Sequence, residues 1–436
     1  MNSARDTSAD ALWSATAISA PATGRLEDNC HCDVAIIGAG FTGLNAALRL
    51  AQAGRSVCVL EKNHVGFGAS GRSGGQVNLG LNLGPSKLIE KFGETKGRRL
   101  VDLVVQTPDT VFDFIKQERL NCDAVANGWV QGAINKDIAA VQQSMVEDYA
   151  HHGFNFELLN KSAIEERSGS ELYMSGIFCK QAGSLHPLSY TRELARVALQ
   201  YGATVYTQSA VTGIQPIDGG WQLSTQYGSV SANQVVICTN GYTEPDTGSL
   251  TRSLHKKIVP VRSVLAATEP LSDNLRKSIL PNQVTFVDKR RLVLYMRYDR
   301  DGRLCVGDHG PMRDDFVDHD FDRVKARAIR VFPQLENVKW EYQWGGRVAM
   351  TKDTLPFLHR VAPGLMAAMG YNGRGVGMGT MMGKTIAQAI IADSWDETAF
   401  PVTSAESFVF HQFQNLGVAA HMHWYSLMDH LKGRST

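Results

Sequence analysis

The segment from Cys32 to Glu61 constrains the fold more than any other part of the sequence. It reads as strand, glycine turn, helix, strand and acid, in the order 34–37, Gly38-Ala39-Gly40-Phe41-Thr42-Gly43, 42–53, 56–60 and Glu61. Glycines at this spacing let the chain turn, let backbone approach a pyrophosphate and let the helix pack closely on the strand. An acid roughly 20 residues further on accepts hydrogen bonds from a ribose. The glycines alone would fit a chance loop, but the complete series predicts a dinucleotide-binding βαβ unit.

The length and charge of the chain limit what surrounds this unit. At 436 residues the chain exceeds one ordinary hydrophobic core, so two or more closely joined units are expected. Its 43% hydrophobic and 20% charged residues are typical of a soluble globular protein. A formal net charge of +1 gives no case for a nucleic-acid partner or for general attraction to an anionic membrane. The oligomeric state stays open.

The cysteines and the apolar pattern indicate a location. Seven scattered cysteines, an odd number with several in apolar strands, are typical of a reducing compartment. No stretch of 18 apolar residues predicts a spanning helix, and residues 1–30 lack the features of a secretory signal. We therefore expect a cytoplasmic protein. Peripheral contact with the inner face of the membrane, through the aromatic and His-rich tail at 404–436, stays open.

A second glycine-rich segment covers residues 66–76 and contains five glycines in eleven residues. Such a composition fits neither a helix nor an ordinary strand. Its backbone N–H groups, two hydroxyls and Arg72 suit a second clamp on phosphates and on a polar ring edge. The alternative is a flexible linker, which Arg72 and Gln76 disfavour.

Two further turns fit a cofactor. Residues 204–240 alternate with period two and end in the apolar run 235–238, after which Thr239-Asn240-Gly241 breaks the strand. Near the C-terminus, the glycine turn 370–376 leads into a helix from about 377 to 391. Free N–H groups and the positive dipole end of that helix suit negative charge on a reduced cofactor.

Several histidines are candidate functional groups. His186 precedes Pro187 and a helix, and it more readily fixes the turn by a hydrogen bond than acts in catalysis. The pair of cysteines in Cys30-His31-Cys32 is interpreted as structural rather than metal-binding. The tail histidines His421, His423 and His430 are interpreted as the exposed face of an amphipathic helix. The sequence therefore predicts no metal site.

Together these motifs resemble the D-amino-acid-oxidase-like superfamily of FAD-dependent oxidoreductases, over residues from about 30 to 430. Within it, Gly68-Ala69-Ser70-Gly71-Arg72-Ser73-Gly74-Gly75-Gln76 is similar to the GASGRNGGQ pattern of the γ-glutamylputrescine oxidase branch, with Ser73 where Asn is common. The ending 424–431 resembles the same branch, to which L-pipecolate oxidases are similar. The resemblance implies an α/β fold in which a Rossmann-like FAD-binding domain is interleaved with an α+β substrate domain built on an antiparallel sheet.

The resemblance also implies which residues hold FAD. Val211 would contact the adenine side through its backbone, and 374–378 would lie at the flavin pyrimidine edge. The full predicted set is Gly38, Gly40, Phe41, Thr42, Gly43, Glu61, Lys62, Gly68, Ala69, Ser70, Arg72, Ser73, Gly74, Gly75, Gln76, Val211, Thr239, Asn240, Gly241, Gly373, Arg374, Gly375, Val376 and Gly377.

Two departures from relatives bear on the cofactor. Sarcosine-oxidase-like relatives attach flavin to a cysteine in the segment that matches 346–351, where this chain has Ala349. We therefore expect non-covalent FAD. The same relatives use a lysine to speed the reaction with oxygen, and Cys305 aligns with that lysine, so either oxygen or a quinone-like carrier is expected as acceptor.

The expected reaction transfers a hydride from a carbon bearing nitrogen to flavin N5, giving an imine, and needs few acid–base groups because FAD does the difficult chemistry. A substrate carboxylate would be held by an arginine fork, for which Arg297 is the candidate beside Tyr295 and Arg374. An outward-facing Arg297 is the alternative, and Arg347 and Tyr371 are secondary candidates. A γ-glutamylated polyamine or a cyclic or secondary amino acid such as L-pipecolate fits this pocket.

The expected domain organisation is discontinuous. Residues 1–29 form an arm anchored by Leu12 and Trp13; 30–95, 160–245 and 345–395 form the FAD-binding domain; 96–159 and 246–344 form the substrate domain; and 396–436 form a helical tail. Two other classes stay open: a nicotinamide-dependent dehydrogenase, which the first glycine motif alone would allow, and a non-enzymatic FAD-containing partner protein.

Overall fold

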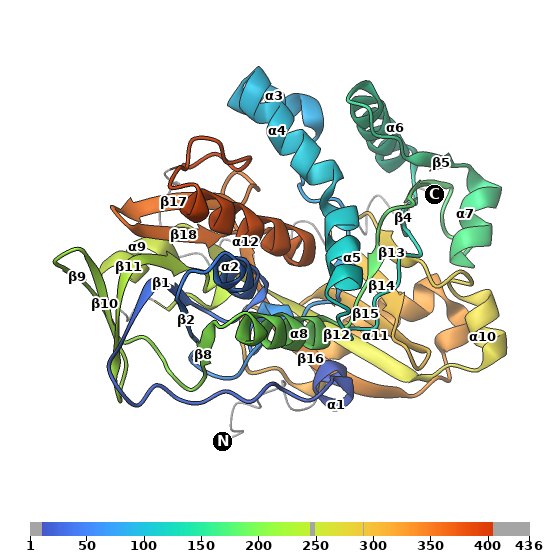
Figure 1. The fold of residues 1–436 in the computed structure, drawn as a ribbon. Coiled ribbons are helices and arrows are strands. Elements are labelled where there is room, and N and C mark those ends of the chain that lie inside the picture. Colours follow the sequence, from blue (N-terminus) through green and yellow to red (C-terminus); the bar gives the residue numbers. More distant parts are fainter. Residues whose placement is uncertain (1–10, 245–248, 291, 404–436) are drawn as a thin grey trace.

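A computed structural model describes residues 11–244, 249–290 and 292–403, and the tail histidines lie outside these residues. The described residues form two eight-stranded sheets (Figure 1) and a small two-stranded one. The predicted α/β class is confirmed. Within the described part of the chain, no helix is both long and apolar enough to cross a membrane.

The first sheet contains the predicted βαβ unit. Its strand order is β17-β18-β11-β1-β2-β8, and β9 and β10 extend it beside β11. The apolar strand β1 lies in the middle and pairs in parallel with β2 and β11. The strands are β1 (Cys30–Ile37), β2 (Val57–Leu60), β8 (Thr204–Tyr206), β9 (Gly213–Ile217), β10 (Gly220–Ser224), β11 (Ser229–Ile237), β17 (Phe357–Ala362) and β18 (Leu365–Met369).

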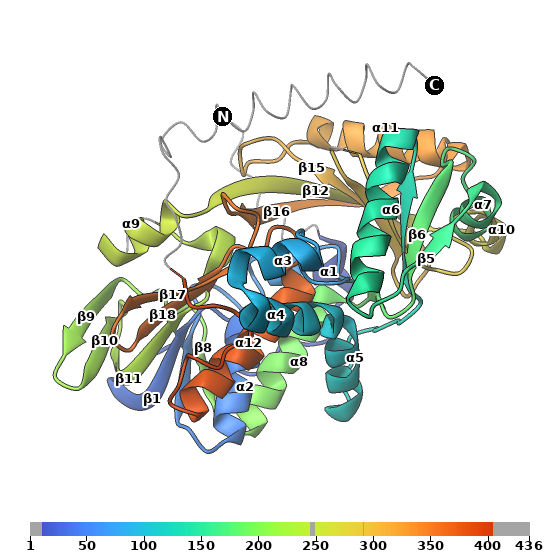
Figure 2. The same ribbon diagram turned by 90° about the horizontal axis from the view of Figure 1, so that it is seen from above.

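Three helices pack together against this sheet. Helix α2 (Phe41–Gln52) contacts both α8 (Pro187–Gln200) and α12 (Gly375–Ile391), and the three lie side by side in Figure 2. Their buried faces share one core with residues of α3 (Pro85–Phe92), α4 (Glu94–Val105) and α5 (Thr107–Gln117). Helices 96–117, which were predicted to belong to the substrate domain, therefore pack with the first sheet.

The second sheet is mainly antiparallel and has the order β16-β12-β15-β14-β13-β4-β6-β5. One face of this sheet packs against α11 (Asp322–Val331) and neighbouring apolar residues, and together they form a second hydrophobic core. The strands are β4 (Trp129–Ala133), β5 (Glu157–Leu159), β6 (Ser175–Cys179), β12 (Val259–Pro270), β13 (Thr285–Asp288), β14 (Leu294–Tyr298), β15 (Arg303–His309) and β16 (Trp340–Met350). Strand β6 therefore belongs to the second sheet, whereas the predicted division assigned residues 160–245 to the FAD-binding domain.

The remaining elements connect or cover the two sheets. They are α1 (Leu12–Thr16), α6 (Lys136–His151), α7 (Lys161–Ser168), α9 (Ser249–His255), α10 (Asp273–Ser278) and the strand pair β3 (Gln76–Val77) and β7 (Gly183–Ser184). Leu12 and Trp13 of α1 are fully buried against β12, β15 and β16. The predicted anchoring of the N-terminal arm by these two side chains is confirmed.

Candidate active site

A cavity of about 1960 Å³ runs between the two sheets, and its walls come from both. Pockets for one small molecule are typically about 300–1,000 Å³. The cavity therefore has room for a dinucleotide and a second, smaller ligand. It extends from the turn after β1 to the inner face of strands β4, β13, β14 and β12.

At one end, the glycine turn has the geometry that its sequence predicts. Gly38 has φ of +109°, in the region that favours glycine. A Cβ on Gly43 would lie 2.1 Å from the Gly38 carbonyl oxygen, so helix and turn pack too closely for any side chain. The Glu61 carboxylate accepts hydrogen bonds from the backbone N–H groups of Ala39 and Asn63, both at 2.9 Å, and burial raises its pKa.

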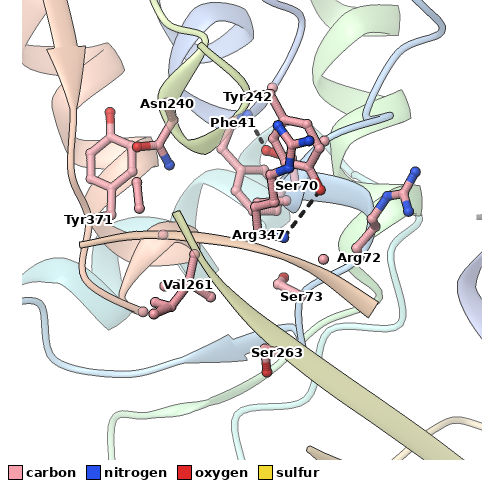
Figure 3. Close-up of a pocket in the computed structure, with 18 of the residues that line it drawn as sticks. Phe41, Ser70, Arg72, Ser73, Asn240, Tyr242, Val261, Ser263, Arg347 and Tyr371 are labelled. Atoms are coloured by element: carbon pink, nitrogen blue, oxygen red, sulfur yellow. Dashed lines mark hydrogen bonds between the residues drawn. The ribbon is translucent and has the colours of Figure 1, made fainter. Parts of the chain in front are cut away.

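The second glycine-rich segment meets the N-terminus of α2. Ser70 Oγ accepts a hydrogen bond of 3.0 Å from the Phe41 N–H, as Figure 3 shows. A Cβ on Gly40 would approach Ser70 Oγ to 2.8 Å. The helix N-terminus, the bare Gly40 backbone and a hydroxyl thus form one cradle, with the donors and the absence of side chains that a pyrophosphate needs. The residues present fit a dinucleotide.

Four successive carbonyls of this segment are held by donors from other elements. Trp344 Nε1 donates to Arg72 O at 2.9 Å, and Trp13 Nε1 donates to Ser73 O at 2.9 Å. Arg297 Nε donates to Gly74 O at 2.8 Å, and the Leu185 N–H donates to Gly75 O at 2.8 Å. Because each carbonyl has a fixed partner, the path of residues 72–75 along the cavity is set by the protein itself. We call this set of four contacts the loop brace.

The placement of Arg297 corrects its predicted role. Its side chain is 4% exposed and also donates to Leu185 O at 2.9 Å and Tyr298 O at 3.1 Å. The guanidinium lies over the Trp13 ring, 4.6 Å from its centroid, and does not line the cavity. Each of its three nitrogens donates to a backbone carbonyl and the side chain lies outside the cavity, so Arg297 is a positioning residue and no fork for a substrate carboxylate.

Tyr295, two residues earlier on β14, does line the cavity. Ser263 Oγ donates to Asp308 O at 2.7 Å, so the Tyr295 hydroxyl donates its proton to Ser263 Oγ at 3.0 Å. Burial raises the pKa of Tyr295 to about 12, which keeps the phenol neutral. The hydroxyl can therefore accept a hydrogen bond from a ligand but does not act as a strong base.

The late glycine turn contacts the first glycine motif and the turn that follows β11. Tyr371 lines the cavity and its hydroxyl lies 2.6 Å from Thr42 Oγ1, while Asn240 Oδ1 accepts from the Gly370 N–H at 2.8 Å (Figure 3). Arg374 precedes α12, and its guanidinium donates to Leu79 O at 3.0 Å. The backbone at the start of α12 borders the cavity at Gly373, Arg374, Gly375 and Val376.

Arg347, a secondary candidate, also lines the cavity, but its charge is committed. Asp314 lies between Arg347 and Arg262 and accepts from both, at distances from 2.7 to 3.1 Å. These two guanidinium groups lower the pKa of Asp314 to about 2. Arg347 also stacks on the Tyr242 ring, whose hydroxyl accepts from the Arg347 N–H (Figure 3).

Most of the residues predicted to bind the cofactor border this one cavity. Three do not: Gly43 packs on Gly38, Gly241 faces the backbone of β16, and Gly377 faces Thr107. The predicted residues that border it are Gly38, Gly40, Phe41, Thr42, Glu61, Lys62, Gly68, Ala69, Ser70, Arg72, Ser73, Gly74, Gly75, Gln76, Val211, Thr239, Asn240, Gly373, Arg374, Gly375 and Val376.

Other lining residues were missed by sequence reasoning. Trp129, Gln131 and Lys289 come from neighbouring strands of the second sheet, and Asn78 and Asn82 follow the second glycine segment. Alternation within β4 and β13 would have placed the first three on one face, but not which face meets the first domain.

His186 has the positional role that its sequence context favoured. Its Nδ1 accepts from the Ser189 N–H at 3.1 Å and so caps α8, and its Nε2 lies 3.1 Å from Thr16 Oγ1 in the N-terminal arm. Burial lowers the pKa of His186 to about 3, so the ring is neutral. With Nδ1 as acceptor, Nε2 carries the proton and donates it to Thr16.

Comparison with known proteins decides the family. A family model described as FAD dependent oxidoreductase, DAO, matches residues 33–389. The chain belongs to this family. It is therefore an FAD-dependent oxidoreductase, which confirms the predicted family, enzyme class and cofactor and excludes the nicotinamide-dependent and non-enzymatic alternatives.

Relatives and solved structures agree with this membership. The flavoenzyme is 35% identical to a probable oxidoreductase OrdL of Haemophilus influenzae, over 83% of this chain and 84% of the relative. It is 30% identical to gamma-glutamylputrescine oxidoreductase of Escherichia coli, over 86% and 87%. The glycine oxidase structure from Geobacillus kaustophilus matches with a TM-score of 0.73 at 21% identity, over 87% of this chain and 99% of that one, which shows a shared fold.

Proposed function

We propose that this flavoenzyme oxidises a C–N bond of an amine or amino acid to an imine, with a γ-glutamylated amine as the favoured substrate. The observation that carries the proposal is one cavity lined at one end by the dinucleotide cradle and at the other by the second sheet. We call the end lined by the second sheet the substrate chamber. Similarity to gamma-glutamylputrescine oxidoreductase over most of both chains supports the substrate class. A cyclic or secondary amino acid such as L-pipecolate is the second candidate.

The cradle residues would hold FAD without a covalent bond. Gly38, Gly40 and the start of α2 would bind the pyrophosphate, Glu61 the ribose, and residues 72–76 with the start of α12 the flavin ring. Cys238 is the cysteine that borders the cavity in the described part of the chain, and burial raises its pKa to about 12. A thiol held in its protonated form is a poor nucleophile, which supports non-covalent binding.

When bound, FAD supplies the hydride acceptor for the substrate carbon that bears nitrogen. The chain's own task is to orient the substrate and to favour its neutral amine, which alone can lose a hydride. Tyr295 contributes an acceptor for a substrate N–H, because its own proton is donated to Ser263. Val261, Leu265 and Val287 give the chamber an apolar wall, which would keep water from the reacting carbon once a substrate fills the chamber.

The electron acceptor would be a quinone-like carrier rather than oxygen. The position that aligns with the oxygen-activating lysine of some relatives is Cys305, which is 2% exposed and packs beside Trp13 and Trp344. This position therefore offers no cation to the cavity. Slow reoxidation in air with fast reoxidation by a quinone dye is the expected result, and rapid peroxide production would contradict it.

Anaerobic reduction of the bound flavin tests the proposal directly. Purified holoenzyme is mixed with a panel of γ-glutamylated amines, cyclic and secondary amino acids and simple amines, and absorbance in the flavin band is followed. Loss of that absorbance with a γ-glutamylated amine at the lowest concentration would support the favoured class. If only L-pipecolate and its analogues bleach the flavin, the second candidate holds, and if no member does, the proposal fails.

A further inference from the structure

Two cations border the substrate chamber without acidic partners. Lys289 follows β13, and Arg374 precedes α12 in the other domain. Among the described residues, neither side chain forms an ion pair with a carboxylate. Asp288, the residue before Lys289, instead pairs with Arg290 at 3.0 Å, and Arg374 has only Leu79 O and a 3.4 Å contact with Asn82 Oδ1.

Several other cations that border the cavity do have acidic partners, which makes Lys289 and Arg374 unusual. Arg262 and Arg347 share the carboxylate of Asp314. Lys62, near the dinucleotide end, pairs with Glu244 at 2.6 Å. Cations removed from water are normally paired, because an uncompensated charge is costly to bury. Burial lowers the pKa of Lys289, and the positive charge of Arg374 lowers it further. An anion bound from outside the chain would stabilise these two cations, which border the same cavity.

Unpartnered polar atoms lie beside these cations. Trp129 is 4% exposed and its Nε1 has no hydrogen-bond partner, although its ring lies 6.0 Å from the Arg374 guanidinium. Trp129 and Lys289 border the same cavity from the paired strands β4 and β13. Asn78 Oδ1 is likewise buried without a partner, next to the residue whose carbonyl binds Arg374. Buried polar atoms are rarely left unsatisfied in the complete, liganded state.

We propose that Lys289, Arg374 and the Trp129 indole N–H bind the carboxylate of the substrate, and that Asn78 Oδ1 accepts from an N–H of the same amino-acid head group. Three donors around one anion and one acceptor beside it complement a free α-amino acid end, as in the glutamyl part of a γ-glutamylated amine. The proposal rests on the proposed function for the reaction and adds the residues that select carboxylated substrates.

Holoenzyme variants Lys289→Met and Arg374→Met test this site, with Lys277→Met as the matched control. Lys277 is an exposed lysine of α10 in the same domain and lies outside the cavity. Substrates are compared in pairs that differ in the amino-acid head group: γ-glutamylputrescine with putrescine, and L-pipecolate with piperidine. The dissociation constant is taken from the substrate dependence of anaerobic flavin reduction.

We expect the carboxylated member to bind about 10- to 100-fold more weakly in either variant, the loss typical of a charge-assisted hydrogen bond. The member without a carboxylate is a cation, so its binding should not weaken in either variant, and the Lys277→Met control should bind both members as the wild type does. Trp129→Phe keeps the ring and removes only the N–H, so a smaller loss, about 3- to 10-fold, is expected. Unchanged discrimination within both pairs in the lysine and arginine variants would overturn the proposal.

A binding measurement separates failure of this site from failure of the proposed reaction. Propionate and its neutral amide, propionamide, are titrated into holoenzyme, and the perturbation of the flavin spectrum is followed. Preference for propionate in the wild type and its loss in Lys289→Met or Lys289→Gln supports the carboxylate site even if no amine reduces the flavin. Equal binding of acid and amide, or an unchanged preference in both variants, removes the site.

Discussion

Arg297 and Arg374 are both withdrawn from bulk water and both donate to backbone carbonyls, yet their surroundings differ. Arg297 has three backbone carbonyl partners and the Trp13 ring as a cover, and it lies outside the cavity. Arg374 has one carbonyl partner and borders the cavity together with a second cation, Lys289.

The difference shows how burial alone misleads about function. A guanidinium whose three nitrogens each donate to a backbone carbonyl holds a segment in place, as Arg297 holds Gly74 in the loop brace. A guanidinium with donors left over, facing a cavity and lacking a carboxylate, is available to a ligand. Hydrogen-bond accounting therefore separates positioning residues from binding residues in this flavoenzyme.

The largest effect is expected from removing Arg297 from the loop brace. In Arg297→Met, the carbonyls of Gly74, Leu185 and Tyr298 lose a buried donor, which costs about 1–3 kcal/mol each when unsatisfied. We expect a loss of roughly 3 kcal/mol or more in the free energy of unfolding, and FAD affinity about 100-fold weaker because the loop is no longer fixed. The ratio of flavin to protein absorbance after dialysis measures the second effect.

Arg98→Met is the control for that experiment. Arg98 is exposed on α4 and pairs only with Glu94, so its loss should leave both stability and FAD content unchanged. If Arg297→Met instead retains its full FAD and loses affinity for carboxylated substrates, the contrast between Arg297 and Arg374 is wrong. Arg297 is then a substrate-binding residue.

A smaller effect is expected from acid, through His186. The folded pKa of His186 is about 3 against a usual 6.5, so below pH 6.5 the unfolded chain takes up a proton that the folded chain refuses. Stability is therefore independent of this group above pH 6.5 and falls between pH 6.5 and about 3, by about 2 kcal/mol at pH 5. Thermal unfolding midpoints measured across this range, with FAD release followed in parallel, give the slope.

His186→Asn sharpens the acid experiment. Asparagine can cap α8 in the same way but does not titrate, so its unfolding midpoint should depend less steeply on pH below 6.5. An identical slope for wild type and variant would show that another group causes the acid response and that the contact between His186 and Thr16 does not govern it.

The smallest effect is expected on the cavity side, from Tyr295→Phe. The ring and its packing under Gly74 are kept, so FAD content should not change. Loss of one hydrogen-bonding hydroxyl costs about 0.5–1.5 kcal/mol, and flavin reduction should slow by about tenfold or less. Tyr298→Phe is the matched control: its hydroxyl donates to Ile279 O in the second core, so it should lower stability without slowing reduction. A loss of FAD in Tyr295→Phe would contradict the division between Arg297, which holds the loop, and Tyr295, which lines the cavity.

Much of the fold could be predicted because its signals are local. The strand–glycine–helix–strand series specified α2 and β2 to within one residue and the end of β1, which begins four residues earlier than predicted. The glycines made this possible because Gly38 and Gly43 meet backbone requirements that the spacing alone indicates. Helices α8 and α12 likewise followed from the Pro and Gly residues that precede them.

The division into domains was less predictable, because it depends on which faces meet. Helices α4 and α5 have apolar stripes that would fit either sheet, and only the packing assigns them to the core of the first. Strand β6 is short and joins the second sheet through pairing with β4, a contact between residues more than 40 positions apart.

The sequence by itself thus determined that the chain carries a dinucleotide cradle, and the resemblance of its glycine loops indicated FAD. Only the tertiary structure decided which polar side chains line the cavity beside the cofactor site. Alternation on β14 puts Tyr295 and Arg297 on one face, but the loop 72–75 crosses that face between them and leaves only Tyr295 in the cavity. Lys289 and Arg374, 85 positions apart, border the same cavity because its walls come from both sheets. Local spacing cannot encode which donors remain unspent, because that depends on partners contributed by the rest of the chain.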